Sequence, residues 1–179
     1  ASFVMWFLFP FYVADVMGRS GLTLGALLAL MAGMNFAGSG LAGWLADRIG
    51  DRPVTFAGTI ITAVGLVLAG SSGSNPTMTT VVTATAVLGL GFGMHQAAVY
   101  ALTLRGTPSE HAGATSAALT VSQTIGTVLS IALITTILNW QQSSNGATFY
   151  EAYRFSYYVA AVIAVISGLV VLRQRSKRR

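Results

Sequence analysis

Long apolar runs follow one another along the chain, separated by short polar breaks. The runs cover residues 1–16, 22–46, 54–71, 77–104, 108–139 and 153–172. A helix needs roughly 17–25 residues to cross a bilayer, whereas a transmembrane strand needs only about 10. Because backbone groups in lipid must be hydrogen-bonded within the protein, the pattern predicts an all-α membrane protein with six transmembrane helices.

Composition supports a lipid environment for most of this surface. The chain is 54% hydrophobic and 8% charged, whereas a soluble domain carries about 25% charged residues. The net charge is +5, and the basic residues lie between and after the apolar runs. This distribution is typical of membrane topology, so we predict no nucleic-acid partner. The chain has no cysteine, so no Cys-based metal or nucleophile site exists, and we predict no metal or cofactor.

The first run is too short for a complete span. It begins at Ala1 without an initiator Met or a basic region, a pattern that is not typical of a signal peptide. Its apolar part covers only residues 3–13, well short of the ~20 residues that a membrane helix needs. We therefore expect the first helix of the bundle to be truncated.

The distribution of Lys and Arg predicts the orientation in the membrane. If the helices alternate in direction, eight basic residues fall on one side and two, Arg19 and Arg154, on the other. The eight are Arg48, Arg52, Arg105, Arg173, Arg175, Lys177, Arg178 and Arg179. The positive-inside rule then predicts a multi-pass protein of the inner (plasma) membrane with a cytoplasmic C-terminus. Residues 1–172 form the bundle and residues 173–179 a basic cytoplasmic tail.

The polar breaks contain helix-start and turn residues. Asn75-Pro76 predicts an N-cap followed by Pro at the first helical position. Residues 107–110, "TPSE", fit a capping box, and Asp51 is placed to cap the third helix. Residues 139–147 predict a polar loop. Aromatic residues around that loop predict an interfacial belt: Trp140, Tyr150, Tyr153 and Tyr157.

Four of the few charged residues fall within six positions, residues 47–52. The surrounding sequence, "GWLADRIGDRPV" at residues 43–54, resembles the loop motif of the major facilitator superfamily, G-x-L-A-D-R-x-G followed by two basic residues. Asp51 departs from the pattern, which has a basic residue there. The matching positions are Gly43, Leu45, Ala46, Asp47, Arg48, Gly50 and Arg52.

The resemblance implies that this loop holds one state of an alternating-access cycle. Independently of the family, glycines such as Gly43 and Gly50 allow a tight turn between helix ends. The Asp47 anion can favour one arrangement of neighbouring helix termini. The alternative is a plain positive-inside turn that serves topology alone.

Two further segments indicate which half of a transporter this is. Residues 89–100, "GLGFGMHQAAVY", and residues 107–133 resemble the last half of the fourteen-helix drug:proton antiporter branch. This resemblance implies one half of a major facilitator fold, with a missing N-terminal half of the same transporter as partner. It also implies a central cavity flanked by the first, second, fourth and fifth helices, with the third and sixth outside.

Polar residues within the predicted spans are the candidates for lining that cavity. No Asp, Glu, Lys or Arg lies well inside a span, so a proton-carrying carboxylate is expected in the missing half. The candidate cavity-lining residues are Asn35, His95, Gln96 and Gln123. Each has an alternative role as an interhelical hydrogen-bonding residue. The glycine run at residues 89–93 predicts close helix packing, because it lacks the context of a nucleotide motif.

Small residues recur every four positions in the second and fifth helices. The second helix carries Gly21, Gly25, Ala29, Gly33 and Ala37, and the fifth carries Ala114, Ala118, Ser122, Gly126 and Ser130. Residues four apart lie above one another on a helix, so each row is a smooth strip that another helix can approach closely. We expect Gly25, Gly33, Ser122 and Gly126 to pack against the other half. The alternative is packing within this bundle.

The resemblance to the drug:proton antiporter branch implies a secondary active transporter, a proton-coupled exporter of drugs or amphipathic small molecules that works by alternating access. The alternative is a major facilitator uptake permease for a metabolite. A remote alternative is a rhomboid-like intramembrane serine protease, because residues 38–40 and His95 resemble part of its site. Ala37 stands where that motif needs Gly. No enzymatic activity is therefore predicted.

Overall fold

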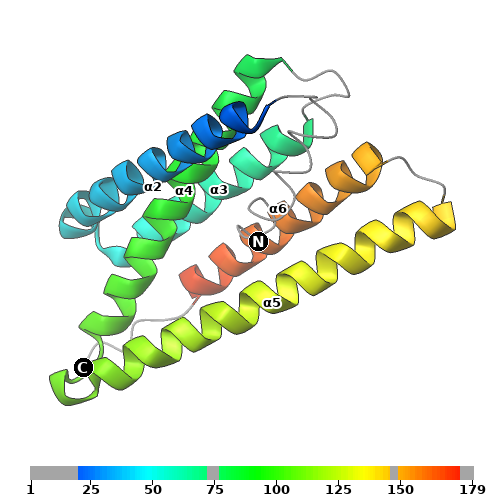
Figure 1. Ribbon diagram of the computed structural model, residues 1–179. Helices are drawn as coiled ribbons and strands as arrows, with labels where there is room; N and C mark the ends of the chain where they lie inside the picture. Colours follow the sequence, from blue (N-terminus) through cyan, green and yellow to red (C-terminus); the bar gives the residue numbers. More distant parts are fainter. Residues whose placement is uncertain (1–19, 72–76, 146–148, 174–179) are drawn as a thin grey trace.

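A computed structural model describes residues 20–71, 77–145 and 149–173 as long helices joined by short connections (Figure 1). The elements are α2 (Gly21–Ile49), α3 (Asp51–Ser71), α4 (Met78–Arg105), the 3₁₀ turn η2 (Ser109–His111), α5 (Ala112–Asn145) and α6 (Phe149–Arg173). Within these residues, five helices are long and apolar enough to cross a membrane. Residues 1–16 lie outside the described ranges, so a six-helix bundle with a truncated first helix stays a prediction.

α4 is the centre of the described bundle. It packs along both α2 and α3, and α3 packs in turn against α6 (Figure 1). α5 runs beside α6, and the first part of α5 touches the end of α4 (Figure 1). Both contacts are less extensive than those of α4 with α2 and α3. Successive helices run in opposite directions, so alternate connections lie at the same end of the bundle.

Glycines let α4 approach its two neighbours at backbone distance. A Cβ on Gly93 would collide with the carbonyl oxygen of Asn35 on α2, and one on Gly91 would lie 2.5 Å from the amide nitrogen of Thr62 on α3. In the opposite sense, a Cβ on Gly58 of α3 would lie 2.5 Å from the His95 amide nitrogen. The prediction that the glycines at residues 89–93 serve close packing is confirmed.

The outward faces of α3 and α6 are apolar. Val64 and Val67 on α3, and Val162, Ile166 and Val170 on α6, are all exposed in the isolated chain. Side chains of this kind are covered by lipid tails when the helices span a membrane.

The connection between α5 and α6 differs from the prediction of a loop at residues 139–147. α5 continues to Asn145 and α6 begins at Phe149. The reason is that no Gly or Pro interrupts the sequence between Gly126 and Gly146, while the intervening Gln, Ser and Asn residues are tolerated in a helix. With 34 residues, α5 is about 51 Å long at 1.5 Å per residue. It is therefore longer than the roughly 30 Å of a hydrocarbon core.

Two predicted caps also differ in the structure. Thr107 does not form a capping box, because its Oγ1 donates to the carbonyl of Thr103 at 2.9 Å in the preceding helix, and residues 109–111 form a 3₁₀ turn without a side-chain cap. Asp51 is the first residue of α3 rather than a cap ahead of it. The cap predicted at residues 75–76 lies outside the described residues.

The predicted aromatic belt is wrong for Tyr153 and Tyr157. Both are buried, with ring centroids 4.5 Å apart, and they pack in the core cluster that joins α6 to the other helices. Because α6 begins one turn earlier than predicted, these residues lie inside the bundle rather than at its rim. Trp140 is exposed, as a belt residue would be.

Candidate functional site

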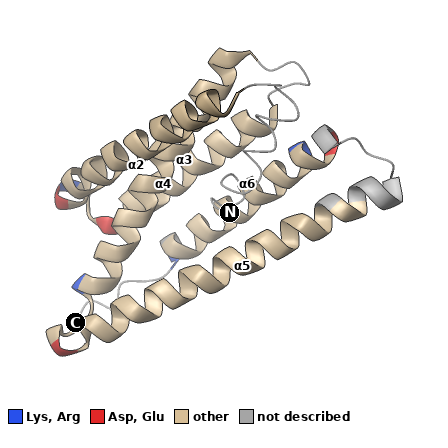
Figure 2. Ribbon diagram, viewed as in Figure 1, with Lys and Arg blue, Asp and Glu red and all other residues tan. Residues whose placement is uncertain are grey.

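A charge cluster gathers where α2 ends, α3 begins and α4 ends (Figure 2). One guanidinium nitrogen of Arg105 lies 3.3 Å from Oδ1 of Asp47, and the other lies 3.4 Å from Oδ2 of Asp51. The fold therefore brings the loop after α2 against the last residue of α4. A cation at the C-terminus of a helix also complements the negative end of the helix dipole.

The two ion pairs of Arg105 differ in their burial. The Asp51 side chain is only 9% exposed, and its Oδ1 is buried without a hydrogen-bond partner among the described residues. The Asp47 side chain is 75% exposed. Exposed ion pairs contribute roughly 0–1 kcal/mol, whereas a mostly buried carboxylate depends strongly on its cation. Asp51 is thus the fixed partner of Arg105, and Asp47 is the partner that can separate at small cost.

This geometry corrects the explanation of Asp51. The sequence suggested that an acid replaces the usual basic residue in order to cap the next helix. Instead, one of its carboxylate oxygens lies 3.4 Å from Arg105, while its backbone carbonyl accepts a hydrogen bond from Thr55 Oγ1 at 2.8 Å. Sequence reasoning placed Arg105 at the correct end of the bundle but could not pair it with Asp51, because the pairing depends on how α3 and α4 cross.

The glycines of the loop motif have different positions. Gly50 is the single residue between α2 and α3, and its φ of 90° is a conformation that side chains rarely adopt. Gly43 lies within α2, where a Cβ would meet nothing within 4 Å. Only Gly50 makes the tight turn that was expected of both. Arg48 stacks over the ring of Trp44 at 4.0 Å, and Arg52 is half-buried in the first turn of α3.

His95 points from α4 towards α3. Its Nδ1 lies 2.9 Å from Thr59 Oγ1, and that hydroxyl also lies 2.8 Å from the carbonyl oxygen of Thr55. A hydroxyl has one proton, so both contacts are satisfied when Thr59 donates to Thr55 and the Nδ1–H of His95 donates to Thr59. The imidazole therefore joins two helices of the bundle interior.

Gln123 joins α5 to α4 in a different region. Tyr100 Oη donates to Gln123 Oε1 at 3.2 Å, and both side chains are half-buried. Gln96 lies one turn before Tyr100 on the same face of α4 and is also half-buried. Of the four candidate cavity-lining residues, His95 therefore faces α3 and Gln123 meets Tyr100, while Asn35 lies on α2 where that helix touches α4. Tyr100 was missed in the sequence because a Tyr near a helix end resembles an interfacial residue.

Both strips of small residues lie on open faces of the described bundle. All five strip residues of α2 are exposed, and so are those of α5 that the structure describes, except Ser130, which is half-exposed. A Cβ on Gly25, Gly33 or Gly126 would meet nothing within 4 Å. Ser122 donates its hydroxyl proton to the carbonyl of Ala118 at 2.8 Å. The strips therefore present smooth surfaces, with the Ser122 hydroxyl bonded within its own helix.

The pieces of a serine protease site are not assembled. Ser39 Oγ donates to the carbonyl of Phe36 at 2.8 Å within α2, whereas His95 contacts Thr59 on α3. No nucleophile–base pair therefore forms between Ser39 and His95.

Comparison with known proteins agrees with this reading of the loop and helices. The family model described as Major Facilitator Superfamily matches residues 1–179, the whole chain. The chain belongs to the major facilitator superfamily. This is a family of transporters rather than enzymes, so the protease alternative is wrong. The chain is accordingly a multi-pass membrane segment of this superfamily.

Several curated members of the superfamily are similar to this chain. An uncharacterized transporter of Escherichia coli strain K12, YebQ, is 29% identical over 94% of the chain and 36% of its own length. A triacylglyceride transporter of Mycolicibacterium smegmatis is 32% identical over 73% of the chain and 23% of its length. One of Mycobacterium tuberculosis strain H37Rv is 30% identical over 90% of the chain and 30% of its length. The chain thus spans between about a quarter and just over a third of these relatives.

Proposed function

We propose that this chain is the C-terminal half of a proton-coupled exporter of amphipathic or apolar small molecules that works by alternating access. The observation that carries the proposal is the charge cluster around Arg105. In this cluster Asp47, which belongs to the loop motif of a transporter superfamily, forms an ion pair with Arg105. That ion pair can open at small energetic cost. The chain covers only 36% and 30% of the length of two relatives, which supports an additional segment in the complete transporter.

The open strips of α2 and α5 support the proposal that the second half of the transporter docks on them. Close approach of helices in a membrane relies on small residues, since lipid supplies no hydrophobic driving force between helices. Gly33 on α2 and Gly126 on α5 have open space where a side chain would be. In our proposal, the partner half slides along these two strips during the cycle.

The uncharged interior of the bundle and two of the relatives support a hydrophobic or amphipathic substrate. In the described residues, Asp, Glu, Lys and Arg lie near the ends of the helices and leave the middle of the bundle uncharged (Figure 2). Two of the relatives are described as triacylglyceride transporters, which favours a hydrophobic or amphipathic solute. The carboxylate that carries protons is expected in the other half. Uptake of a metabolite is the alternative, and the direction of transport distinguishes the two.

Transport by the full-length protein in proteoliposomes tests this proposal. An imposed proton gradient should drive a fluorescent amphipathic solute in the direction opposite to the protons, and an uncoupler should abolish that movement. Asp47→Asn should lower the initial rate while leaving the half-saturating concentration within a few-fold. The reason is that the change shifts the equilibrium between conformations, and about 1.4 kcal/mol in such an equilibrium corresponds to a tenfold change.

One control variant and two contrary outcomes make the result decisive. Glu110→Gln removes a carboxylate at the same end of the bundle, and we expect it to leave transport unchanged because the ion pair of Glu110 is with the adjacent His111, at 3.7 Å. Movement of solute together with protons would favour the uptake permease instead. An unaltered rate in Asp47→Asn would return the loop to a purely topological role.

The proposed orientation can be read with single cysteines, since the chain has none of its own. Ser71 is the last residue of α3 and Ser109 the first of the turn before α5, so these two exposed residues lie at opposite ends of the bundle (Figure 1). An impermeant thiol reagent added to intact cells should label Ser71→Cys and spare Ser109→Cys. The reverse pattern would contradict a cytoplasmic charge cluster.

A further inference from the structure

An apolar groove runs along the outer surface of the bundle between α3 and α6. Its volume is about 540 Å³, within the range of roughly 300–1,000 Å³ typical of ligand sites. Among the residues that line it, only Tyr158 carries a polar side-chain atom. The lining residues from α3 are Ile60, Ala63, Val64, Val67 and Leu68, and those from α6 are Tyr158, Ala161, Val162, Val165 and Ile166.

Gly70 of α3 and Arg154 of α6 lie next to Tyr158, the residue of the groove nearest the start of α6. A Cβ on Gly70 would lie 3.3 Å from Cε1 of Tyr158 and 3.5 Å from the carbonyl oxygen of Arg154. The missing side chain therefore lets the first turns of α6 lie directly against the end of α3. The guanidinium of Arg154 lies over the Tyr158 ring at 5.6 Å from its centroid. A cation thus lies beside one of the residues that line this apolar groove.

The position of Arg154 along α6 matches the edge of a bilayer. It lies close to the start of α6 at Phe149, about 7–8 Å along the helix axis at 1.5 Å per residue. The residues of α6 that line the groove, from Tyr158 to Ile166, continue on the same face, from about 6 Å to about 18 Å deeper than Arg154 on the same scale. Arginine at such a depth extends its head to the interface while its stem lies along apolar surface.

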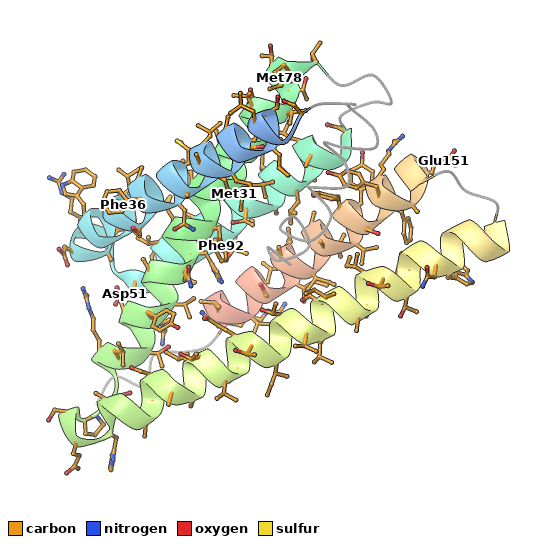
Figure 3. The ribbon with its side chains drawn as sticks, viewed as in Figure 1. Met31, Phe36, Asp51, Met78, Phe92 and Glu151 are labelled. Atoms are coloured by element: carbon orange, nitrogen blue, oxygen red, sulfur yellow. The ribbon has the colours of Figure 1, made fainter. Side chains whose placement is uncertain are left out.

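We propose that this groove binds one phosphatidylethanolamine molecule of the bilayer, with an acyl chain between α3 and α6 and its phosphate on Arg154. Arginine presents five N–H donors in a fork that suits phosphate, so it can bind a phosphate while it stacks on Tyr158. Glu151, one turn earlier on α6 and exposed (Figure 3), provides a carboxylate for the ammonium group of the lipid. That carboxylate disfavours a lipid with a second negative charge.

The occupant is a bilayer lipid because both walls of the groove belong to membrane-spanning helices. The site lies on the outward side of α3 and α6, away from the α4–α5 contact at Gln123. The proposal is therefore independent of which solute the transporter carries.

Native mass spectrometry of the full-length transporter, released from nanodiscs of phosphatidylethanolamine, tests the site. We expect the wild type to retain one lipid. Arg154→Gln removes the phosphate contact, and Val162→Trp fills the groove. Each should lower the retained fraction several-fold. Arg173→Gln and Val170→Trp are the matched controls, because Arg173 is an exposed arginine at the other end of α6 and Val170, at 53% exposed, resembles Val162 at 59%.

The controls should retain lipid as the wild type does. Equal losses in the controls, or no loss in either groove variant, would identify the lipid as ordinary bilayer lipid and overturn the proposal. Loss in Val162→Trp alone, with Arg154→Gln unchanged, would also overturn it, because the phosphate contact would be absent. Nanodiscs doped with diacylglycerol complete the test, since equal retention of that phosphate-free lipid would contradict recognition by Arg154.

Discussion

The glycines of α2 and α4 form two surfaces of opposite character. Gly38 of α2 and Gly89 and Gly93 of α4 lie where the two helices touch, and a Cβ on any of them would meet backbone of the facing helix. Gly25 and Gly33 of α2 belong to a strip with open space around it. Glycine occurs on both surfaces. One surface is covered by a neighbouring helix, while the other is open.

The difference teaches that a row of small residues specifies close approach but not the identity of the approaching helix. On α2, the buried positions include Leu27 and Met31, and α2 packs along α4. Gly25, Ala29 and Gly33 lie about half a turn away from them, on the opposite side of the helix. One helix can thus accommodate two partners, and we propose that the second partner is the other half of the transporter.

The largest expected effect is at the covered surface. Gly93→Ala would press a methyl group into the carbonyl of Asn35, and such overpacking costs about 1–3 kcal/mol. We expect a clearly lower thermal unfolding midpoint for the purified full-length transporter. Gly113→Ala is the control, because Gly113 lies outside both strips and its methyl group would meet nothing within 4 Å. Equal losses in the two variants would mean that the contact with Asn35 is not the cause.

The next effect concerns the open strips. Gly33→Leu and Gly126→Leu should abolish or strongly reduce transport, because a bulky side chain keeps the partner half at a distance. Their unfolding midpoints should change less than that of Gly93→Ala. Val128→Leu, on an exposed position of α5 outside the strip, should transport normally. If the strip variants unfold as readily as Gly93→Ala, the strips are internal to this bundle and our assignment fails.

The smallest effects are expected at the polar side chains within the spans. His95→Leu removes a bond between α3 and α4, and interhelical hydrogen bonds in membranes contribute about 0.6–2 kcal/mol. We expect a modest loss of stability with an altered transport rate. Gln123→Leu removes the contact with Tyr100 between α4 and α5, and we expect a change in the relative rates for a panel of solutes. Tyr100→Phe should resemble Gln123→Leu if the pair acts together, and unchanged profiles in both would assign the pair to packing.

The sequence alone determined the class of this protein. Apolar runs of helical length and few charges indicated membrane-spanning helices, because lipid tolerates only internally bonded backbone. The loop at residues 43–54 indicated the major facilitator superfamily through its resemblance to the motif of that family. Helix starts and ends were predicted to within a few residues, except where polar residues continued α5 to Asn145. That extension was missed because polarity ends a span but does not end a helix.

Tertiary structure decided which small or polar residue meets which neighbour. Asp51 pairs with Arg105 at the end of α4, and Tyr100 pairs with Gln123 on the next helix, because crossing helices bring together residues that are distant in sequence. Local pattern could not distinguish Gly93, pressed against Asn35, from Gly33, which is open. Both are glycines in apolar helices, and only the position of a second helix determines whether the missing side chain is needed for packing or leaves a surface for a partner.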